Sequence, residues 1–168
     1  LRKNRPLLTY FSSGLMNSGC IEAISEIVMS MRRMELYSCI EDPLASELWS
    51  HKACIKIHNM PGFTFIEGDY CEFGVKHPLE GTLVSQGYRL LTDAPFLVGM
   101  SRPCTHESKV AHASCDDQRV LSYPDSFCRL FAQCLKFLKQ PRFITYEFSK
   151  AIFIPTITLK NISVKTSS

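Results

Sequence analysis

Apolar side chains recur at helical spacing over residues 18–33, and a short run of strand-forming residues follows them directly. The apolar positions are Ile21, Ile24, Ile27, Val28 and Met31. Steps of three and four residues place these side chains on one face of a helix, and Arg32 and Arg33 suit the C-terminal end of its dipole. The pattern predicts an amphipathic helix followed by a buried strand over 36–40, which the polar residues 41–43 bring to an end.

The same alternation continues along the chain. Aromatic and β-branched residues predict strands over 63–71 and 87–92. Pro43 predicts a short helix over 44–51, with Asp42 as its N-cap. Helices that alternate with strands are typical of a layered α/β sheet, which is the fold class we expect.

A second amphipathic helix is expected to open at Tyr123 and Pro124 and to end before Pro141. Its apolar stripe consists of Phe127, Leu130, Phe131, Cys134, Leu135 and Leu138. Residues 93–122 are polar and predict irregular structure. Residues 143–159 are rich in Ile, Phe and Thr and predict one or two further strands, with Pro155 confined to an edge or a loop.

With 168 residues, the chain is long enough to build one hydrophobic core. We therefore expect a single α/β domain over 1–168, with residues 141–168 as a C-terminal extension. Because the first residue is leucine, we expect the sequence to be a fragment of a longer domain.

Composition says more about where the protein is located than about what it binds. The net charge of +3 is too small to indicate a nucleic acid or a membrane surface. No apolar run approaches the ~20 residues that cross a bilayer, and residues 7–13 do not form the apolar core of a secretory signal. Eight of the 168 residues are cysteine, a share below the ~8–10% of disulfide scaffolds. We expect reduced thiols and an intracellular protein, nuclear or cytoplasmic.

Glu41 and Asp42 place carboxylates directly after the predicted strand over 36–40. Ligands of open α/β sheets bind at the carboxyl ends of strands. A carboxylate there can accept a hydrogen bond from the exocyclic amine of a nucleobase. The alternative is that one of these carboxylates caps the helix that follows.

The segment Glu41-Asp42-Pro43 resembles the Glu-Asn-Val or Glu-Asn-Pro motif of cytosine-5 DNA methyltransferases, in particular divergent methylase-like genes of phages and mobile elements. Residues 69–75, Asp-Tyr-Cys-Glu-Phe-Gly-Val, resemble the Asp-Tyr-Gly-Val-Pro-Gln turn of that family. The strand with Arg89 falls where the family has its arginine-containing strand. Tyr123-Pro124 is similar in place to the last family motif, which completes the cofactor pocket. The resemblance covers residues 20–138.

The resemblance implies a Rossmann-like, methyltransferase-type sheet with flanking helices, incomplete at the N-terminus. Glu41 would contact the target cytosine, Arg89 would help to orient it, and DNA would be the partner. The Phe-x-Gly-x-Gly loop for S-adenosylmethionine and the Pro-Cys nucleophile loop do not precede the Glu41 strand, and Pro103-Cys104 lies on its far side. We therefore expect a divergent or truncated methyltransferase-like protein that lacks catalysis by itself, with S-adenosylmethionine as cofactor only if an upstream segment supplies those loops.

Four potential metal ligands gather in the polar region, in the pattern Cys104-x-His106-x5-His112-x2-Cys115. Tetrahedral zinc accepts sets of two cysteines and two histidines. Cys104 and His106 are too close along the chain for the usual ligand pairs, and a set in which Cys71 replaces one member is equally compatible. The sequence thus predicts an alternative function, a non-catalytic zinc-binding interaction module, beside the plainer interpretation of a polar surface loop.

Overall fold

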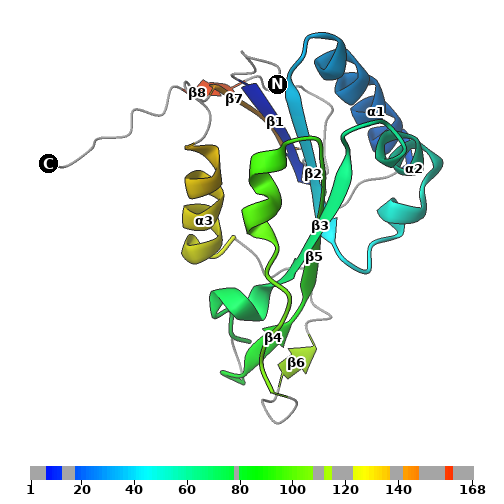
Figure 1. The fold of residues 1–168 in the computed structure, drawn as a ribbon. Helices are drawn as coiled ribbons and strands as arrows, with labels where there is room; N and C mark the ends of the chain where they lie inside the picture. The colour runs from blue at the N-terminus through cyan, green and yellow to red at the C-terminus, as the bar shows by residue number, and fades with distance from the viewer. Residues whose placement is uncertain are drawn as a thin grey trace, which may run out of the picture.

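The computed structural model describes residues 7–12, 18–77, 80–107, 112–114, 123–136, 142–147 and 158–160. These residues form a mixed six-stranded sheet with helices on both faces and a small second sheet at one end (Figure 1). The expected α/β class is therefore confirmed. Among the described residues, no helix is long and apolar enough to span a membrane.

The large sheet has the strand order β3-β5-β2-β1-β7-β8. Its strands are β1 (Leu7–Ser12), β2 (Tyr37–Pro43), β3 (Thr64–Asp69), β5 (Gly87–Thr92), β7 (Arg142–Glu147) and β8 (Thr158–Lys160). β2, β1 and β7 run parallel to one another, whereas β5 is antiparallel to both β2 and β3, and β8 is antiparallel to β7. Strands that are far apart in the sequence, β1 and β7, therefore pair with each other in one sheet.

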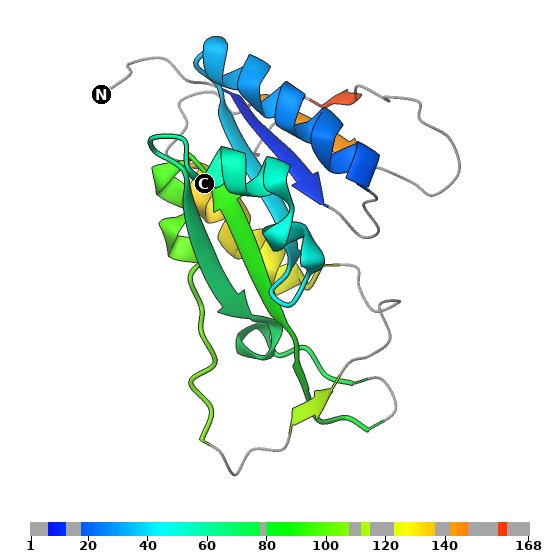
Figure 2. The same cartoon turned by 90° about the vertical axis from the view of Figure 1, so that its right-hand side faces the viewer.

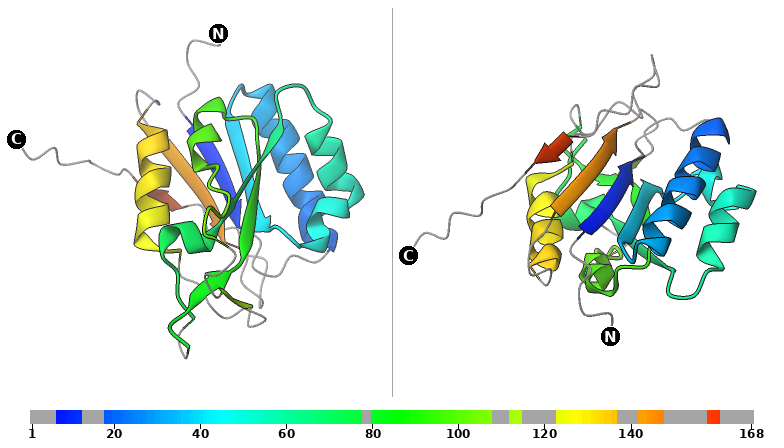
Figure 3. Two further views of the ribbon diagram at one scale, coloured as in Figure 1. Left: turned by 60° about the horizontal axis from the view of Figure 1, so that its bottom comes forward. Right: turned by 90° about the horizontal axis from the view of Figure 1, so that it is seen from above.

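Helices cover the two faces of this sheet. The elements are α1 (Ser18–Arg33), η1 (Glu47–Ser50), α2 (Lys52–His58), η2 (Tyr70–Phe73), η3 (Pro95–Met100) and α3 (Asp125–Leu135). α1 and α2 lie on one face, and α3 and η3 lie on the other (Figure 3). The result is a three-layer arrangement, with the sheet between two helical layers.

Two hydrophobic clusters lie on opposite faces of the sheet, because successive side chains of a strand point to opposite sides. On β2, Cys39 belongs to the cluster beneath η3 and α3, whereas Ile40 belongs to the cluster beneath α1 and α2. On β5, Leu90 and Leu91 divide in the same way. All four side chains are fully buried. A residue's place along these strands therefore decides which helical layer it meets.

The small sheet consists of β4 (Leu83–Ser85) and β6 (His112–Ser114), which pair in parallel. It lies beyond the end of β5, away from the helices α1 and α2 (Figure 2). Val84 and Ala113 are buried in it. This sheet and η2 form the end of the molecule that carries the candidate site.

The expected end of the first strand is wrong. β2 continues through Glu41 and Asp42 to Pro43, so that neither carboxylate lies in a loop at the end of the strand. The reason is the antiparallel neighbour β5, whose Leu90 and Arg89 pair with Glu41 and Asp42. Such pairing is a tertiary contact and overrides the weak strand propensity of acidic residues.

The expected helix over 44–51 is also wrong in extent and in its cap. The structure has the shorter η1, and its N-cap is Ser46, whose Oγ accepts a hydrogen bond from the backbone amide of Leu48 at 3.1 Å. Asp42 lies in β2 and is not the cap of this helix. A further helix, α2, follows at once and begins after His51, whose side chain caps it.

The region 93–122 was expected to be irregular, but it contains η3 and β6, which form through tertiary contacts with α3 and β4. Several other elements agree with the sequence-based expectations. α1 and β5 occupy the expected ranges 18–33 and 87–92, and the expected strand over 63–71 appears as β3 followed by η2. The region 143–159 was expected to supply one or two strands, and β7 and β8 fall there. α3 opens after Pro124 as expected, and Pro141 lies outside the described residues.

Candidate metal centre

Cys71 lies in η2, the turn that follows β3. Tyr70 anchors this turn, since its ring is buried against Tyr88 and Phe127. Gly74 ends it in the left-handed conformation, with φ of 72°, and its amide donates to the carbonyl of Cys71 at 2.9 Å. Glycine adopts this conformation without a steric penalty. The turn is thus fixed at both ends and holds Cys71 with an exposed fraction of 3%.

Cys104 reaches the same place from the segment after η3. Gly68 and Arg102 form a parallel bridge, and the amide of Asp69 donates to the carbonyl of Arg102 at 2.8 Å. Two residues further on, the amide of Cys104 donates to Asp69 Oδ2 at 2.7 Å. These bonds hold residues 101–105 along the end of β3, so that Cys104 lies beside the turn of Cys71.

His112 comes from β6. It pairs with Leu83 of β4, and the neighbouring Val84 amide donates to the carbonyl of Val75 just after η2, at 2.9 Å. The small sheet is therefore tied to η2. Its position brings His112 to the two cysteines.

Cys71, Cys104, His106 and His112 form a cluster in which the four ligand atoms lie within 4.8 Å of one another. Cys104 Sγ lies 3.4 Å from His106 Nδ1 and 3.7 Å from His112 Nε2. Zinc–sulfur and zinc–nitrogen bonds in a tetrahedral site imply a separation of about 3.6 Å between sulfur and nitrogen ligands. The four side chains can thus hold a metal ion, and the set is compatible with zinc.

Two carboxylates lie next to this cluster. Glu72 Oε1 accepts hydrogen bonds from the amide and the hydroxyl of Thr105, at 2.7 and 3.0 Å, and lies 3.4 Å from His106 Nδ1. The Thr105 hydrogen bonds are the main reason why the pKa of Glu72 lies below its ordinary value. With Asp69, Glu72 adds negative charge beside a group of soft ligands, which favours a cation there.

The Cys71 thiol is held in its protonated form when no cation is bound. Burial, together with a hydrogen bond shared with Cys104, raises the pKa of Cys71 to about 12. A metal ion bound by a thiolate displaces that proton. Both cysteines are free of disulfides in this structure.

Three members of the sequence-based metal set lie together in the structure. Cys104, His106 and His112 come together, and Cys71, which the sequence offered as an equally compatible ligand, joins them. Cys115 lies outside the described residues. The supporting carboxylates Asp69 and Glu72 were not expected, although both stand within two residues of Cys71 in the sequence.

The structure does not bring Glu41 and Arg89 together. Glu41 is buried on the face of α3, where its carboxylate accepts hydrogen bonds from the hydroxyls of Tyr70 and Tyr123. The distance from Tyr70 is 3.2 Å. Because Arg89 pairs with Asp42, the next residue along β2, its side chain points to the opposite face of the sheet.

Arg89 lies on the face of α2, among aromatic side chains. Its guanidinium carbon is 4.8 Å from the ring centre of Phe65 and 5.6 Å from that of Trp49. It forms an ion pair with Glu67, with 2.6 Å between Arg89 Nη2 and Glu67 Oε1. The positive charge of Arg89 is therefore compensated within the chain.

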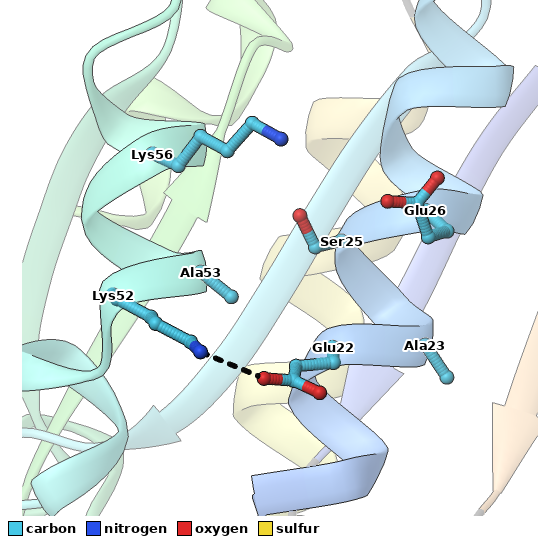
Figure 4. A pocket seen from close by; sticks show the side chains of 7 residues that line it. All are labelled: Glu22, Ala23, Ser25, Glu26, Lys52, Ala53 and Lys56. Carbon is cyan, nitrogen blue, oxygen red and sulfur yellow. Dashed lines mark ion pairs between the residues drawn. The ribbon is translucent and has the colours of Figure 1, made fainter.

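A groove also lies between α1 and α2, with a volume of about 580 Å³ (Figure 4). Glu22 and Glu26 line one side and Lys52 and Lys56 the other. Lys52 Nζ lies 3.3 Å from Glu22 Oε1, and both side chains are more than half exposed. Exposed ion pairs of this kind contribute little free energy, and the groove holds no soft ligand.

Comparison with protein-family models, curated proteins and solved structures finds no match for this chain. Its site is therefore interpreted from its own residues and their geometry.

Proposed function

We propose that this chain is a non-catalytic zinc-binding interaction module, in which the α/β sheet is the scaffold. The zinc ion would be held by Cys71, Cys104, His106 and His112. The observation that carries the proposal is the approach of four soft or borderline ligand atoms to within 4.8 Å of one another. Zinc sites with four protein ligands are structural, because no position is left for a reacting water.

The metal would order the exposed surface at this end of the molecule. Residues 101–105 are all exposed, and backbone bonds and the carboxylates of Asp69 and Glu72 hold them to β3 and η2. Loops held on a rigid scaffold are where proteins most often bind partners. The zinc-ordered segment 101–107 is therefore the proposed contact surface.

The proposal is tested by the metal content of the purified chain. The full chain is purified from zinc-supplemented cells without chelator, and its zinc is measured by mass spectrometry of the elements. We expect about one zinc per chain, and tetrahedral visible bands with thiolate character after replacement by Co²⁺. Cys104→Ser should lose the metal. Cys128→Ser, which removes another exposed thiol that does not belong to the cluster, should keep it.

An absence of zinc from the wild-type chain, or full zinc occupancy in Cys104→Ser, would contradict the proposal.

Among the described cysteines none forms a disulfide, which suits a reducing location inside the cell, nuclear or cytoplasmic.

The resemblance to cytosine-5 DNA methyltransferases stays a prediction of a second function, with DNA as partner and S-adenosylmethionine supplied by upstream motifs. Its Rossmann-like sheet would have to accommodate the antiparallel β5 between β2 and β3. We prefer the zinc module, because Glu41 and Arg89 lie on opposite faces of the sheet. Fluorescence anisotropy with duplex DNA, at low and at physiological salt, tests the second function directly.

A further inference from the structure

The two thiols of the metal cluster differ sharply in their access to solvent. Cys104 is exposed, whereas Cys71 is 3% exposed and lies behind it in η2. Their sulfur atoms belong to a group within 4.8 Å, and the two thiols share a hydrogen bond. An accessible thiol with a second thiol at hydrogen-bond distance is the arrangement found in redox-sensitive cysteine pairs.

The backbone keeps this pair together independently of a metal. The amide of Cys104 is bound to Asp69, and Asp69 precedes Cys71 by two residues. The bridge between Gly68 and Arg102 joins the same two segments just before Asp69 and Cys104. A disulfide requires sulfur atoms about 2.05 Å apart. Side-chain rotation and a small shift of the exposed segment would bring Cys104 to that distance.

We propose that Cys104 and Cys71 form a peroxide-reactive pair whose oxidation to a disulfide releases the zinc. This inference rests on the proposed zinc site. The oxidant is hydrogen peroxide or an organic hydroperoxide, and the exposed sulfur of Cys104 is the point of attack.

The reaction proceeds in two steps. The Cys104 thiolate attacks one oxygen of the peroxide, so that a sulfur–oxygen bond forms and the oxygen–oxygen bond breaks. The leaving group takes a proton and becomes water from hydrogen peroxide or an alcohol from an organic hydroperoxide. The Cys71 thiolate then attacks the sulfur of Cys104, forms the disulfide and releases hydroxide, which becomes water. Two thiolates supply the two electrons that reduce the peroxide. Zinc dissociates because both sulfur ligands have lost their negative charge.

Three other described cysteines do not offer this arrangement. Cys39 and Cys54 are fully buried, beyond the reach of an oxidant in solvent. Cys128 is exposed, but its thiol donates to the backbone carbonyl of Tyr123, at 3.9 Å. Cys128 therefore serves as the control for an exposed thiol outside the pair.

Oxidation would change one part of the site and preserve another. The disulfide would keep residues 101–105 attached to η2, while His106 and His112 lose their common ligand. Because His112 begins β6, release of the metal would loosen the small sheet of β4 and β6 and leave the large sheet intact. The expected response is thus a local change of the proposed contact surface.

The experiment follows zinc and sulfur in the same sample. Zinc-loaded full chain, with its metal content measured beforehand, is treated with hydrogen peroxide in the presence of a zinc-sensitive dye. Peptides are then mapped by mass spectrometry without reduction. We expect one zinc released for each Cys71–Cys104 disulfide formed, and recovery of zinc binding after a dithiol reductant. Cys128→Ser should behave as the wild type.

The outcomes separate the inference from the proposed function. If the chain is purified without zinc, the proposed function is contradicted, and the proposed release of zinc is contradicted as well. A chain that contains zinc but keeps it under peroxide overturns the inference alone. So does a disulfide that joins Cys104 to Cys115 in place of Cys71. Peptide mapping of the metal-free chain, in which Cys71→Ser should abolish the disulfide, checks the pairing without the metal.

Discussion

The carboxylate of Asp69 accepts a hydrogen bond from the backbone amide of Cys104, with 2.7 Å between Asp69 Oδ2 and the nitrogen. Asp69 also stands at the start of the turn that carries Cys71. One side chain therefore fixes the relative position of the two cysteines of the cluster. Partners of this kind, just outside the ligands, orient them before the metal binds.

Replacement of Asp69 should weaken metal binding. Asp69→Ala removes the acceptor for the Cys104 amide, and we expect zinc affinity to fall by roughly 10–100-fold. Asp69→Asn keeps an oxygen acceptor and should lose less. Competition with a chelator of known affinity measures both variants. Equal affinity in Asp69→Ala and wild type would show that the ligands do not need this hydrogen bond.

Removal of zinc should loosen one end of the molecule only. Without the metal, segment 101–107 is held by the Asp69 and Glu72 bonds and by the Arg102 bridge. Hydrogen exchange after chelation should therefore rise in η2, β4 and β6, while α1 and β2 keep their protection. At a zinc concentration ~100 times the dissociation constant, binding contributes about 2.7 kcal/mol to the free energy of unfolding. A uniform rise in exchange over the whole chain would contradict this expectation.

Asp42 should make the protein less stable as the pH rises. Burial, the largest cause, raises the pKa of its carboxyl from 3.8 to about 6, while the Ser46 hydrogen bond lowers it and Glu41 raises it. Between pH 4 and 6 the unfolded chain loses this proton before the folded chain does, so the free energy of unfolding decreases. The loss is complete above pH 6 and is on the order of 1–2 kcal/mol after allowance for solvent screening.

The variant Asp42→Asn isolates this effect, because its amide oxygen can still accept the Ser46 hydrogen bond. Urea denaturation of both proteins at pH 4 and pH 7 gives the four free energies required. The wild type should lose more stability than the variant between the two values. An identical loss in both would rule out Asp42 as the source.

Arg89 should act in stability and not in DNA binding. Arg89→Lys loses the planar contact with Phe65 and Trp49, and we expect a cost of about 1 kcal/mol in urea denaturation. Glu67→Gln should cost less, since the Glu67 side chain is 47% exposed. The DNA affinity of the folded Arg89→Lys variant tests the alternative, in which Arg89 contacts DNA. A clear decrease there would favour the methyltransferase-like function.

The hydroxyls of Tyr70 and Tyr123 should stabilise the buried carboxylate of Glu41. Tyr70→Phe or Tyr123→Phe removes one donor and keeps the ring, so each should cost about 1–3 kcal/mol in the free energy of unfolding. The double variant tests their coupling, because both donors meet the same carboxylate. A single variant as stable as the wild type would show that Glu41 is satisfied by other groups.

The helices that the sequence predicted well are long enough to repeat the apolar stripe over several turns. α1 spans 16 residues and α3 spans 11, which is enough for an apolar stripe to be recognised. α2 has seven residues and the strands β4 and β6 have three each, too few to show any period. Short elements of this kind exist because of tertiary contacts, not because of their own propensity.

The metal cluster was predictable where its ligands are neighbours in sequence. Cys104, His106 and His112 fall within one short segment, and their residue types alone indicated zinc. The set with Cys71 and the set without it were equally compatible with the sequence, because nothing local says which distant cysteine returns to that segment. The bridge between Gly68 and Arg102 decides it, and that bridge forms only in the folded chain.

The sequence by itself determined the α/β class, the two amphipathic helices and the residue types that gather at the cluster, since all of these follow from local periodicity and side-chain chemistry. The tertiary structure alone decided the surroundings of Glu41 and Arg89. β5 pairs with β2 so that Arg89 stands opposite Asp42, and this register sends Glu41 to the other face of the sheet. Register depends on which strands meet and in which direction, and a one-residue shift would exchange the two faces.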